Sequence, residues 1–529
     1  MMGRSVRSPA YYRRADAELF SSMSQERPYD TDLLEVTCLM GEVSLGGRDS
    51  LQSQRDIPHS SGLVQSVPDE VLAEIFQAGR DSDDSVNIDY SSLPFPHPFP
   101  HLVSSVSRRW RDVALNSPRL WTTIVINCDQ MTYRREGSPC KDSSLCIERS
   151  KACLLDITIL TRSSFRDYHL ENNLQTAMDQ IMPHTSRWRR FTVNNLRSQN
   201  MIDAVIPRLR TASAPHLRYF QITFDFPTPT YASSNACVRL FTEGAASLTD
   251  ARLIGTYIYT PPLTGLTYLQ FGGTPLEDME ITVNFLRDLV TAPLFLIKLD
   301  LQRLDIVFPL DTTSSVSDIQ IPSLCSLVMS RVSSRGHDFW KLFSLFSLPK
   351  LDTLTLAHMS QFSEPLTDIG HQIYATVTVL GLLHCNHIHH SLAKSLYSSF
   401  PSINQLDVVG SSGLVLEPPY VRYDGDLAVI WPRLETITIT YPVTYGMIRD
   451  FIDNRKEMGH PLGVVNVWSR IRRKREVCKL DYGFKSRFQY APGLASAIEE
   501  VEYEEYDDRR YEEEHLSSRD FEGYEGDSG

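Results

Sequence analysis

The chain has 529 residues, 42% of them hydrophobic and 22% charged, which is ordinary for a globular protein with enough apolar material for a large core. The net charge of −13 is uneven, because residues 499–529 hold ten Glu and four Asp against three Arg. The other residues are nearly neutral, so their charge identifies no partner class. The nine Cys form no CxxC pair, which argues against a disulfide framework and a paired-cysteine zinc site.

No secretory leader and no run of 18 apolar residues is present, so we expect no membrane partner. Together with the scattered cysteines, this favours a cytoplasmic or nuclear location. Residues 1–62, rich in Ser, Arg and Asp, are expected to be mostly disordered, with one helix possible around the apolar run at 33–40. A helical domain is expected over residues 63–125.

The first expected helix lies in the stretch SVPDEVLAEIF, residues 66–76. Its apolar residues fall on one helical face, and Ser66 is a candidate N-cap, with acidic residues in the first turn. We expect this helix to end at Gly79, because glycine is a common C-terminal stop. A Pro-rich insertion at 77–101, containing PFPHPFPH, then separates it from the next helix.

The second expected helix lies in LVSSVSRRWRDVALNSPRLW, residues 102–121. It carries an apolar face that includes Leu102 and Trp110, and Asn116-Ser117-Pro118 is expected to end it. Leu120 and Trp121 begin a short third element. Beyond it, TTIVINC and LLDITIL carry β-branched residues that predict strands.

A repeat dominates residues 126–465. Each copy has an apolar residue, then apolar residues three and five places later, often with Pro two places before the first, as in PKLDTLTL. The first positions are Leu154, Trp188, Leu217, Leu248, Leu266, Leu296, Leu324, Leu351, Val377, Ile403 and Leu434. Most gaps are 26–31 residues. The 18-residue gap between the copies at 248 and 266 indicates that one of these two is a misread.

The last two apolar residues of each copy face one side of a short strand, and helical patterns such as KLFSLFSL separate the copies. A single unit cannot bury this face alone, so the units are expected to stack. This pattern resembles a leucine-rich repeat. The fold class expected is therefore α/β, with a small all-α unit followed by a leucine-rich-repeat-like solenoid on a parallel sheet, between disordered termini. An irregular α/β domain with chance spacing remains the alternative, since only Cys385 matches the Asn/Cys position of the leucine-rich repeat.

The helical region resembles the F-box of fungal F-box proteins, through VPDEVLAEIF and VSRRWRDVALNSPRLW, although the linker between the helices is much longer than usual. The resemblance implies a substrate-receptor subunit of a cullin-RING (SCF-type) ubiquitin ligase, without catalysis or cofactor of its own. It implies binding to a Skp-family adaptor, and through it to a cullin and a RING subunit. The residues expected to contact the adaptor are Val67, Pro68, Val71, Leu72, Ile75, Phe76, Leu102, Val103, Val106, Trp110, Val113, Leu120 and Trp121.

The repeat region is expected to bind an unidentified target protein. Exposed positions at the expected strands are candidates for this contact, namely Arg218, Lys298, Asp352, Thr353 and Glu435. The competing hypothesis is a repeat scaffold that binds proteins without any ubiquitin ligase.

Other chemistry is weakly indicated. The cluster HCNHIHH, 384–390, offers metal-ligand types, but it leaves a strand and enters a helix, so we expect a solvated loop and no metal. No P-loop, G-x-S-x-G or H-E-x-x-H motif occurs.

The C-terminal extension 466–498 contains RIRRKR, which fits surface charge or nuclear import, and we expect no nucleic-acid partner. The acidic tail 499–529 lacks the rigid scaffold that catalysis needs.

Overall fold

The structure is a computed structural model, and the chain is described over most of residues 67–468. The described residues are 67–85, 99–128, 140–161, 169–225, 238–256, 258–274, 276–308, 318–334, 339–359, 374–385, 396–409, 411, 416, 420–423, 426–440 and 445–468. The expectations for residues 1–62, for RIRRKR and for the acidic tail lie outside these ranges. So do the N-cap Ser66 and the greater part of HCNHIHH.

The first part of the described chain is helical. It contains α4 (Asp69–Ser85), α5 (Phe99–Val106), α6 (Arg108–Leu115) and the 3-10 helix η1 (Pro118–Trp121). Later helices are α7 (Cys140–Arg149), α8 (His169–Ile181), η3 (Met182–Arg187), α9 (Gln199–Arg210), α10 (Val283–Thr291), α11 (Phe339–Ser344) and α13 (Tyr445–Glu457). None of the helices in these ranges has both the length and the apolar character that crossing a membrane requires.

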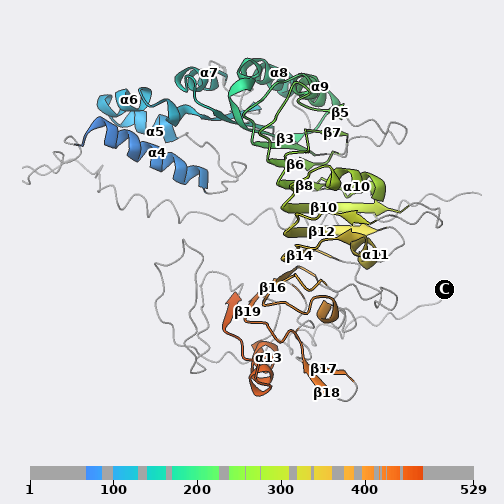
Figure 1. The fold of residues 1–529 in the computed structure, drawn as a ribbon. Helices are drawn as coiled ribbons and strands as arrows, with labels where there is room; N and C mark the ends of the chain where they lie inside the picture. Colours follow the sequence, from blue (N-terminus) through green and yellow to red (C-terminus); the bar gives the residue numbers. More distant parts are fainter. Residues whose placement is uncertain are drawn as a thin grey trace, which may run out of the picture. The chain divides into compact units, whose positions relative to one another are not determined.

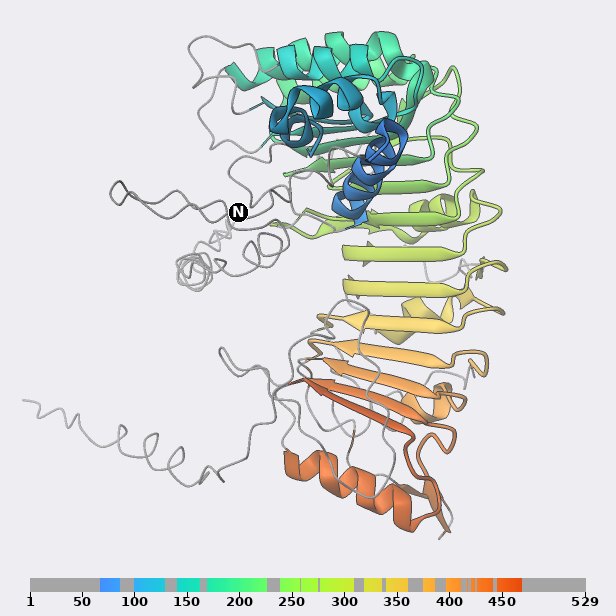
Figure 2. The ribbon, with the colours of Figure 1, turned by 90° about the vertical axis from the view of Figure 1, so that its left-hand side faces the viewer.

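The rest of the fold is built on one open sheet of 14 strands (Figures 1 and 2). Its strands are β1 (Thr123–Asn127), β2 (Leu155–Leu160), β3 (Trp188–Leu196), β4 (Tyr219–Phe224), β6 (Asp250–Ile254), β8 (Tyr268–Gly272), β9 (Met279–Thr282), β10 (Lys298–Val307), β12 (Ser326–Ser334), β14 (Thr353–Ala357), β15 (Val379–Leu383), β16 (Gln405–Val409), β19 (Thr436–Thr440) and β20 (Val464–Trp468). Small two-stranded pairs join β5 (Val238–Arg239) with β7 (Tyr259–Thr260), β11 (Ile319–Gln320) with β13 (Phe346–Ser347), and β17 (Tyr420–Tyr423) with β18 (Asp426–Val429).

The strands of the large sheet follow one another in chain order and every pair is parallel, except that β9 lies off this order and pairs with the later part of β10. Each of the eleven repeat copies contributes a strand to this sheet. The copies at Leu248 and Leu266 both do so, as β6 and β8, so the inference that one of them was misread is wrong. The repeat pattern did not include β1 and β20, which add a strand at each end of the sheet.

Equivalent residues of the repeats are paired across the sheet. Leu299 is opposite Leu327, and Leu327 is opposite Leu354, and all three are fully buried. Their neighbours Lys298, Ser326 and Thr353 point to the other side, because successive side chains of a strand alternate. One face of the sheet therefore forms the core, and we call the other face, which carries the alternate half-exposed residues, the open face.

Two details of the helical part differ from the sequence expectations. Helix α4 does not end at Gly79 but continues to Ser85, so the insertion expected from residue 77 begins inside a helix. Gly79 instead gives room to Phe99 of α5, whose ring a Cβ at position 79 would meet at 2.5 Å. The second helix is broken at Ser107, which has extended backbone and accepts a hydrogen bond from the Trp110 amide at 3.1 Å as the N-cap of α6.

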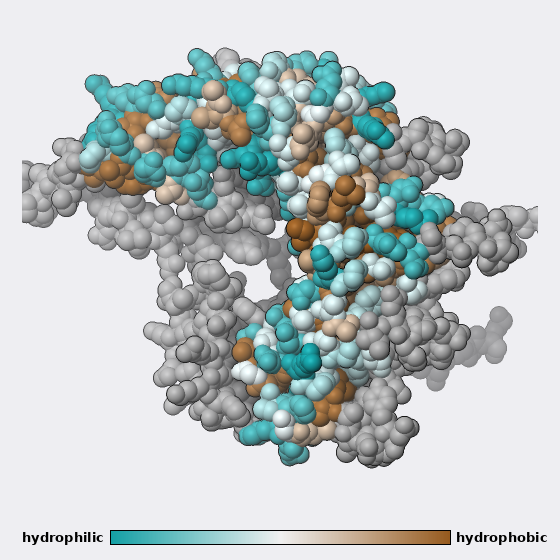
Figure 3. All heavy atoms as spheres, in the orientation of Figure 1, coloured by the Kyte–Doolittle hydropathy of each residue, from teal (hydrophilic) through white to brown (hydrophobic). Residues whose placement is uncertain are grey.

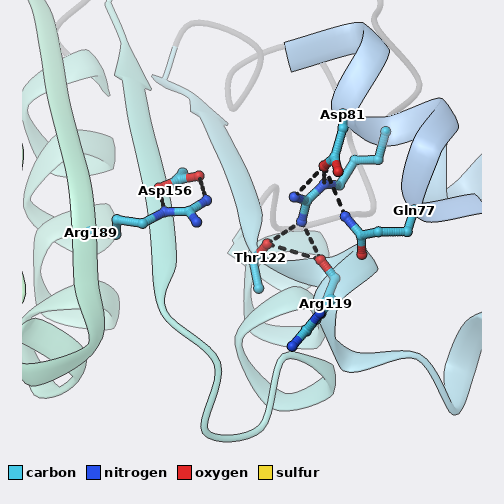
Figure 4. Close-up of polar contacts among 7 residues, drawn as sticks. Gln77, Asp81, Arg119, Thr122, Asp156 and Arg189 are labelled. Carbon is cyan, nitrogen blue, oxygen red and sulfur yellow. Dashed lines mark hydrogen bonds and ion pairs between the residues drawn. The ribbon is translucent and has the colours of Figure 1, made fainter. Parts of the chain in front are cut away.

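Polar contacts tie α4 to the start of the sheet (Figure 4). The Arg80 guanidinium donates to the Arg119 carbonyl oxygen and to Thr122 Oγ1, the latter at 2.5 Å. It also pairs with Asp81 at 2.7 Å, and Asp81 accepts a further hydrogen bond from Gln77. Arg80 thus joins the last turns of α4 to the segment that leads from η1 into β1.

Candidate functional site

The helices α4, α5 and α6 form a small core of their own. Asp69 at the start of α4 accepts two hydrogen bonds from the Arg109 guanidinium of α6, at 2.8 and 2.7 Å. Leu72 and Phe76 of α4 are buried, as is Val103 of α5. The Phe76 ring packs on the Trp110 ring with a centroid distance of 4.9 Å. The unit therefore buries one apolar stripe of each helix.

A second apolar stripe is left uncovered in the described structure. On α4, Val71 and Ile75 are 47% and 53% exposed, and on α5, Leu102 and Val106 are 51% and 58% exposed. Each pair is spaced by four residues and so lies on one side of its helix. We call these four residues the helical apolar patch. Figure 3 shows hydrophobic residues lying among hydrophilic ones on this part of the surface.

The residues expected to bind an adaptor therefore differ in their exposure to solvent. Pro68 and the four residues of the helical apolar patch are exposed, and Val67 and Trp110 are half-buried. The rest belong to the internal core of the chain, namely Leu72, Phe76, Val103, Val113, Leu120 and Trp121.

This burial corrects the expectation that Phe76 and Trp121 contact an adaptor. Phe76 is 1% exposed and Trp121 is 0% exposed. The Trp121 indole donates to the Ala114 carbonyl oxygen at 2.8 Å, and the Arg149 guanidinium lies over its ring at 4.3 Å. Sequence periodicity marks a helix as apolar on a wide face, but it does not show which edge of that face a neighbouring helix covers.

A second surface lies on the open face of the sheet. Arginine, tyrosine and lysine side chains contact one another there across five successive strands, β3, β4, β6, β8 and β10. The residues are Arg190, Tyr219, Arg252, Tyr268 and Lys298, which we call the cation–tyrosine ladder. The residue of β6 directly opposite both tyrosines is Asp250, and the arginine of this strand stands two residues further along. The cationic groups lie 4.4 to 5.5 Å from the centroids of the tyrosine rings, within the range of cation–π attraction.

The ladder is held in place by its neighbours. Tyr219 donates a hydrogen bond to Gln221 at 2.5 Å, and burial raises the pKa of Tyr268 to about 12, so both phenols are neutral. Burial also raises the pKa of Asp300, whose carboxylate accepts hydrogen bonds from the Gln302 amide. Arg252 lies between the two tyrosine rings, and its buried Nε has no hydrogen-bond partner among the described residues.

The five residues expected to bind a target all lie at the amino-terminal ends of strands. Arg218, Lys298, Asp352 and Glu435 are exposed, and Thr353 is half-buried. They are not brought together as one site, because they extend from β4 to β19 across eight strand spacings, on the order of 40 Å. Only Lys298 belongs to the ladder. The other ladder residues were missed, although Tyr219, Tyr268 and Lys298 share the position two places after the first apolar residue of their repeats.

No group of three or more His, Cys, Asp or Glu side chains converges in the described ranges as metal ligands do. Of the HCNHIHH cluster, His384 and Cys385 are described. Cys385 is buried, its backbone amide donates to Ser411 Oγ at 2.8 Å, and its thiol donates to the Leu356 carbonyl oxygen.

Comparisons with known proteins assign the chain to no family. No protein-family model matches it, and no curated protein matches it significantly.

Proposed function

We propose that the chain is a substrate receptor of a cullin-RING ubiquitin ligase, in which α4, α5 and α6 act as an F-box that binds a Skp-family adaptor. The sequence motifs VPDEVLAEIF and VSRRWRDVALNSPRLW support this proposal by their order and residue types. The observation that carries it is the helical apolar patch. A small helical unit that leaves Val71, Ile75, Leu102 and Val106 uncovered has a surface suited to a protein partner.

The size of the patch is sufficient for a contribution to binding. Burying a Val, Leu or Ile side chain completely is worth roughly 1.5–3 kcal/mol. These four residues are about half exposed, so a partner that covers them gains a part of that energy from each. Trp110, half-buried on α6 beside Phe76, adds an aromatic residue of the type enriched in binding hot spots.

The stacked parallel strands resemble a leucine-rich-repeat solenoid, and we propose that their open face binds the target protein. The cation–tyrosine ladder is the part of this face best suited to the role. Arginine and tyrosine are enriched at protein interfaces, and here they are preorganised by contact with one another. Exposed apolar residues at the same end of the strands, Leu294, Phe295 and Ile297, extend the surface beside Lys298.

Co-purification tests the adaptor proposal. The full chain is co-expressed with a Skp-family adaptor, next to an Ile75→Asp/Val106→Asp variant. The expected result is a complex with the wild type and none with the variant. The matched control is Arg218→Asp/Glu435→Arg, which changes exposed residues of the sheet and should retain the complex. A folded wild-type chain that never co-purifies with the adaptor would refute the proposal.

The alternative is a repeat scaffold that binds proteins without a ubiquitin ligase. The open face with its ladder serves this function equally well, so the two proposals differ only in the role of the helical unit. If the scaffold alternative is correct, the Ile75→Asp/Val106→Asp variant and the wild type should capture the same partners, and neither set should contain a Skp adaptor or a cullin.

A further inference from the structure

A row of basic side chains crosses four adjacent strands at their carboxyl-terminal ends. Arg303 of β10, Arg331 of β12, His358 after β14 and His384 after β15 each stand seven places after the first apolar residue of their repeat. We call them the basic row. The residues that precede them in the chain are paired across the sheet, as Gln302 is with Ser330. The four side chains of the row therefore occupy neighbouring positions on adjacent strands.

The backbone holds the row in an unusual conformation. The four residues have φ values of 51°, 51°, 50° and 54°, in the left-handed region that favours glycine. The equivalent position of the copy at Leu248 is Gly255, with φ of 75°. The amides of His358 and His384 donate to carbonyl oxygens of the next strands, at 2.7 and 2.6 Å, which fixes this geometry. The four basic residues therefore occupy a position at which glycine would be less strained.

The row has little compensating negative charge of its own. Among the described residues its one ion pair joins Arg303 to Asp278 at 3.7 Å, and Asp305 is the next acid along β10. Burial and the neighbouring basic groups His384, Arg331 and Arg303 lower the pKa of His358. The His358 and His384 rings stack at 4.8 Å. The lowered pKa favours the neutral form of His358, so the row owes its positive charge to Arg303 and Arg331, whose mutual repulsion a bound anion would relieve.

The length of the row favours an acidic chain segment over a single small anion. Four residues on strands about 4.8 Å apart extend over roughly 14 Å. The sequence contains a matching segment, EEVEYEEYDDRRYEEE at 499–514, with eight Glu and two Asp against two Arg. Its Glu500, Glu502 and Glu504 alternate, so in an extended conformation they would share one face and span about 13 Å.

The connection is long enough for the same chain to supply this segment. The last described strand, β20, ends at Trp468 and lies three strand positions from β15 and six from β10. That separation is on the order of 15–30 Å. The residues between Trp468 and Glu499 can reach much further, since an extended chain covers up to about 3.3–3.6 Å per residue.

We propose that the basic row is an intramolecular docking site for the acidic segment 499–514. Carboxylates of the segment lie against Arg303, Arg331, His358 and His384. The carboxyl-terminal edge of the sheet is thereby occupied by the chain itself, and an acidic partner would have to displace the segment before it could bind there.

Cleavage of the full chain by a glutamate-specific protease tests the proposal. Cuts within residues 499–514 are followed by mass spectrometry and normalised to a free peptide of the same sequence. In the wild type at low salt we expect cleavage to be slower by roughly fivefold or more, and high salt should remove this protection. The Arg303→Gln/Arg331→Gln variant should be cut like the free peptide at both salt concentrations.

Two controls make the result decisive. Arg218→Gln/Arg433→Gln removes two exposed positive charges at the other end of the strands and should keep the protection. If the double arginine variant does not fold, the single variants Arg303→Gln and Arg331→Gln take its place. Equal cleavage of the wild type and the row variant would overturn the proposal, and it would direct attention to RIRRKR as a competing site. Protection that increases with protein concentration would indicate a second copy and would also overturn it.

Discussion

The Phe76 ring of α4 lies against the Trp110 ring of α6, at a centroid distance of 4.9 Å and an interplanar angle of 54°. The two residues have different surroundings, because Phe76 is buried and Trp110 is half-buried. Their contact closes the small helical core and leaves the neighbouring Ile75 facing solvent. Adjacent residues of one helix thus have separate roles, one in folding and the other in the proposed binding surface.

Substitution of these neighbours should separate stability from binding. Phe76→Ala is expected to destabilise the helical unit by about 3–5 kcal/mol, because it leaves a cavity against Trp110. Ile75→Ala, on the exposed side, should change the free energy of unfolding by about 0.5 kcal/mol or less. Urea denaturation followed by Trp fluorescence measures both values. Similar losses for the two variants would show that Ile75 is a core residue as well.

Gly272 of β8 is required by the close approach of β10. A Cβ at this position would lie 2.1 Å from the Gln302 carbonyl oxygen, a backbone atom that cannot move without disturbing the sheet. Gly272→Ala should therefore destabilise the protein by about 1–3 kcal/mol. Gly463→Ala is the control, since its nearest contact would be at 3.6 Å. Thermal unfolding that shows no difference between the two variants would contradict the paired geometry of β8 and β10.

The stability contributed by Asp300 should depend on pH. Burial raises its pKa above the ordinary value of 3.8, although hydrogen bonds from Gln302 and the charges of Lys298 and Arg252 oppose the shift. The folded chain therefore binds this proton more tightly than the unfolded chain does. The resulting stabilisation is complete below pH 3.8 and is lost as the pH rises through the raised pKa.

The Asp300→Asn variant removes this titration. Its unfolding free energy relative to the wild type should therefore increase between about pH 3 and about pH 7. Chemical denaturation at several pH values measures the difference. A relative stability that is constant or falls over this interval would show that Asp300 is not desolvated on the open face.

The cation–tyrosine ladder should show energetic coupling between its members. The Arg190 guanidinium lies 4.4 Å from the Tyr219 ring centroid, and a double-mutant cycle with Arg190→Ala and Tyr219→Leu should give a coupling of about 0.5–1 kcal/mol. Arg190→Ala combined with Thr438→Ala on the distant strand β19 should be additive. Additivity in both cycles would mean that the ladder is not preorganised.

The sequence predicted the strands of the repeat well, because their apolar spacing reflects a physical requirement. Leu351, Leu354 and Leu356 are buried, and the same holds for equivalent positions such as Leu324 and Leu327. A repeated pattern with one buried face leads to parallel, in-register stacking. The end strand β20 was missed although Leu462, Val465 and Val467 stand at the three apolar positions of the repeat, as the pairing of β19 with β20 shows.

The binding surfaces were predictable only in part. Val71 and Ile75 were among the residues chosen, but so were Phe76 and Trp121, because an apolar residue has the same sequence signature in a core and on an exposed patch. The ladder and the basic row depend on which residues become neighbours across strands. Arg303 and Arg331 are 28 positions apart in the chain, and only the strand register brings them together.

The central claim is that the helical apolar patch binds an adaptor, and calorimetric titration of the full chain with a purified Skp-family adaptor tests it most directly. The account predicts a one-to-one complex whose formation has a negative heat-capacity change, because Val71, Ile75, Leu102 and Val106 lose contact with water. Ile75→Asp/Val106→Asp should abolish the binding heat while the thermal unfolding of the protein is unchanged. A folded wild type that gives no binding heat at any temperature, or a complex that the double variant forms equally well, would contradict the account.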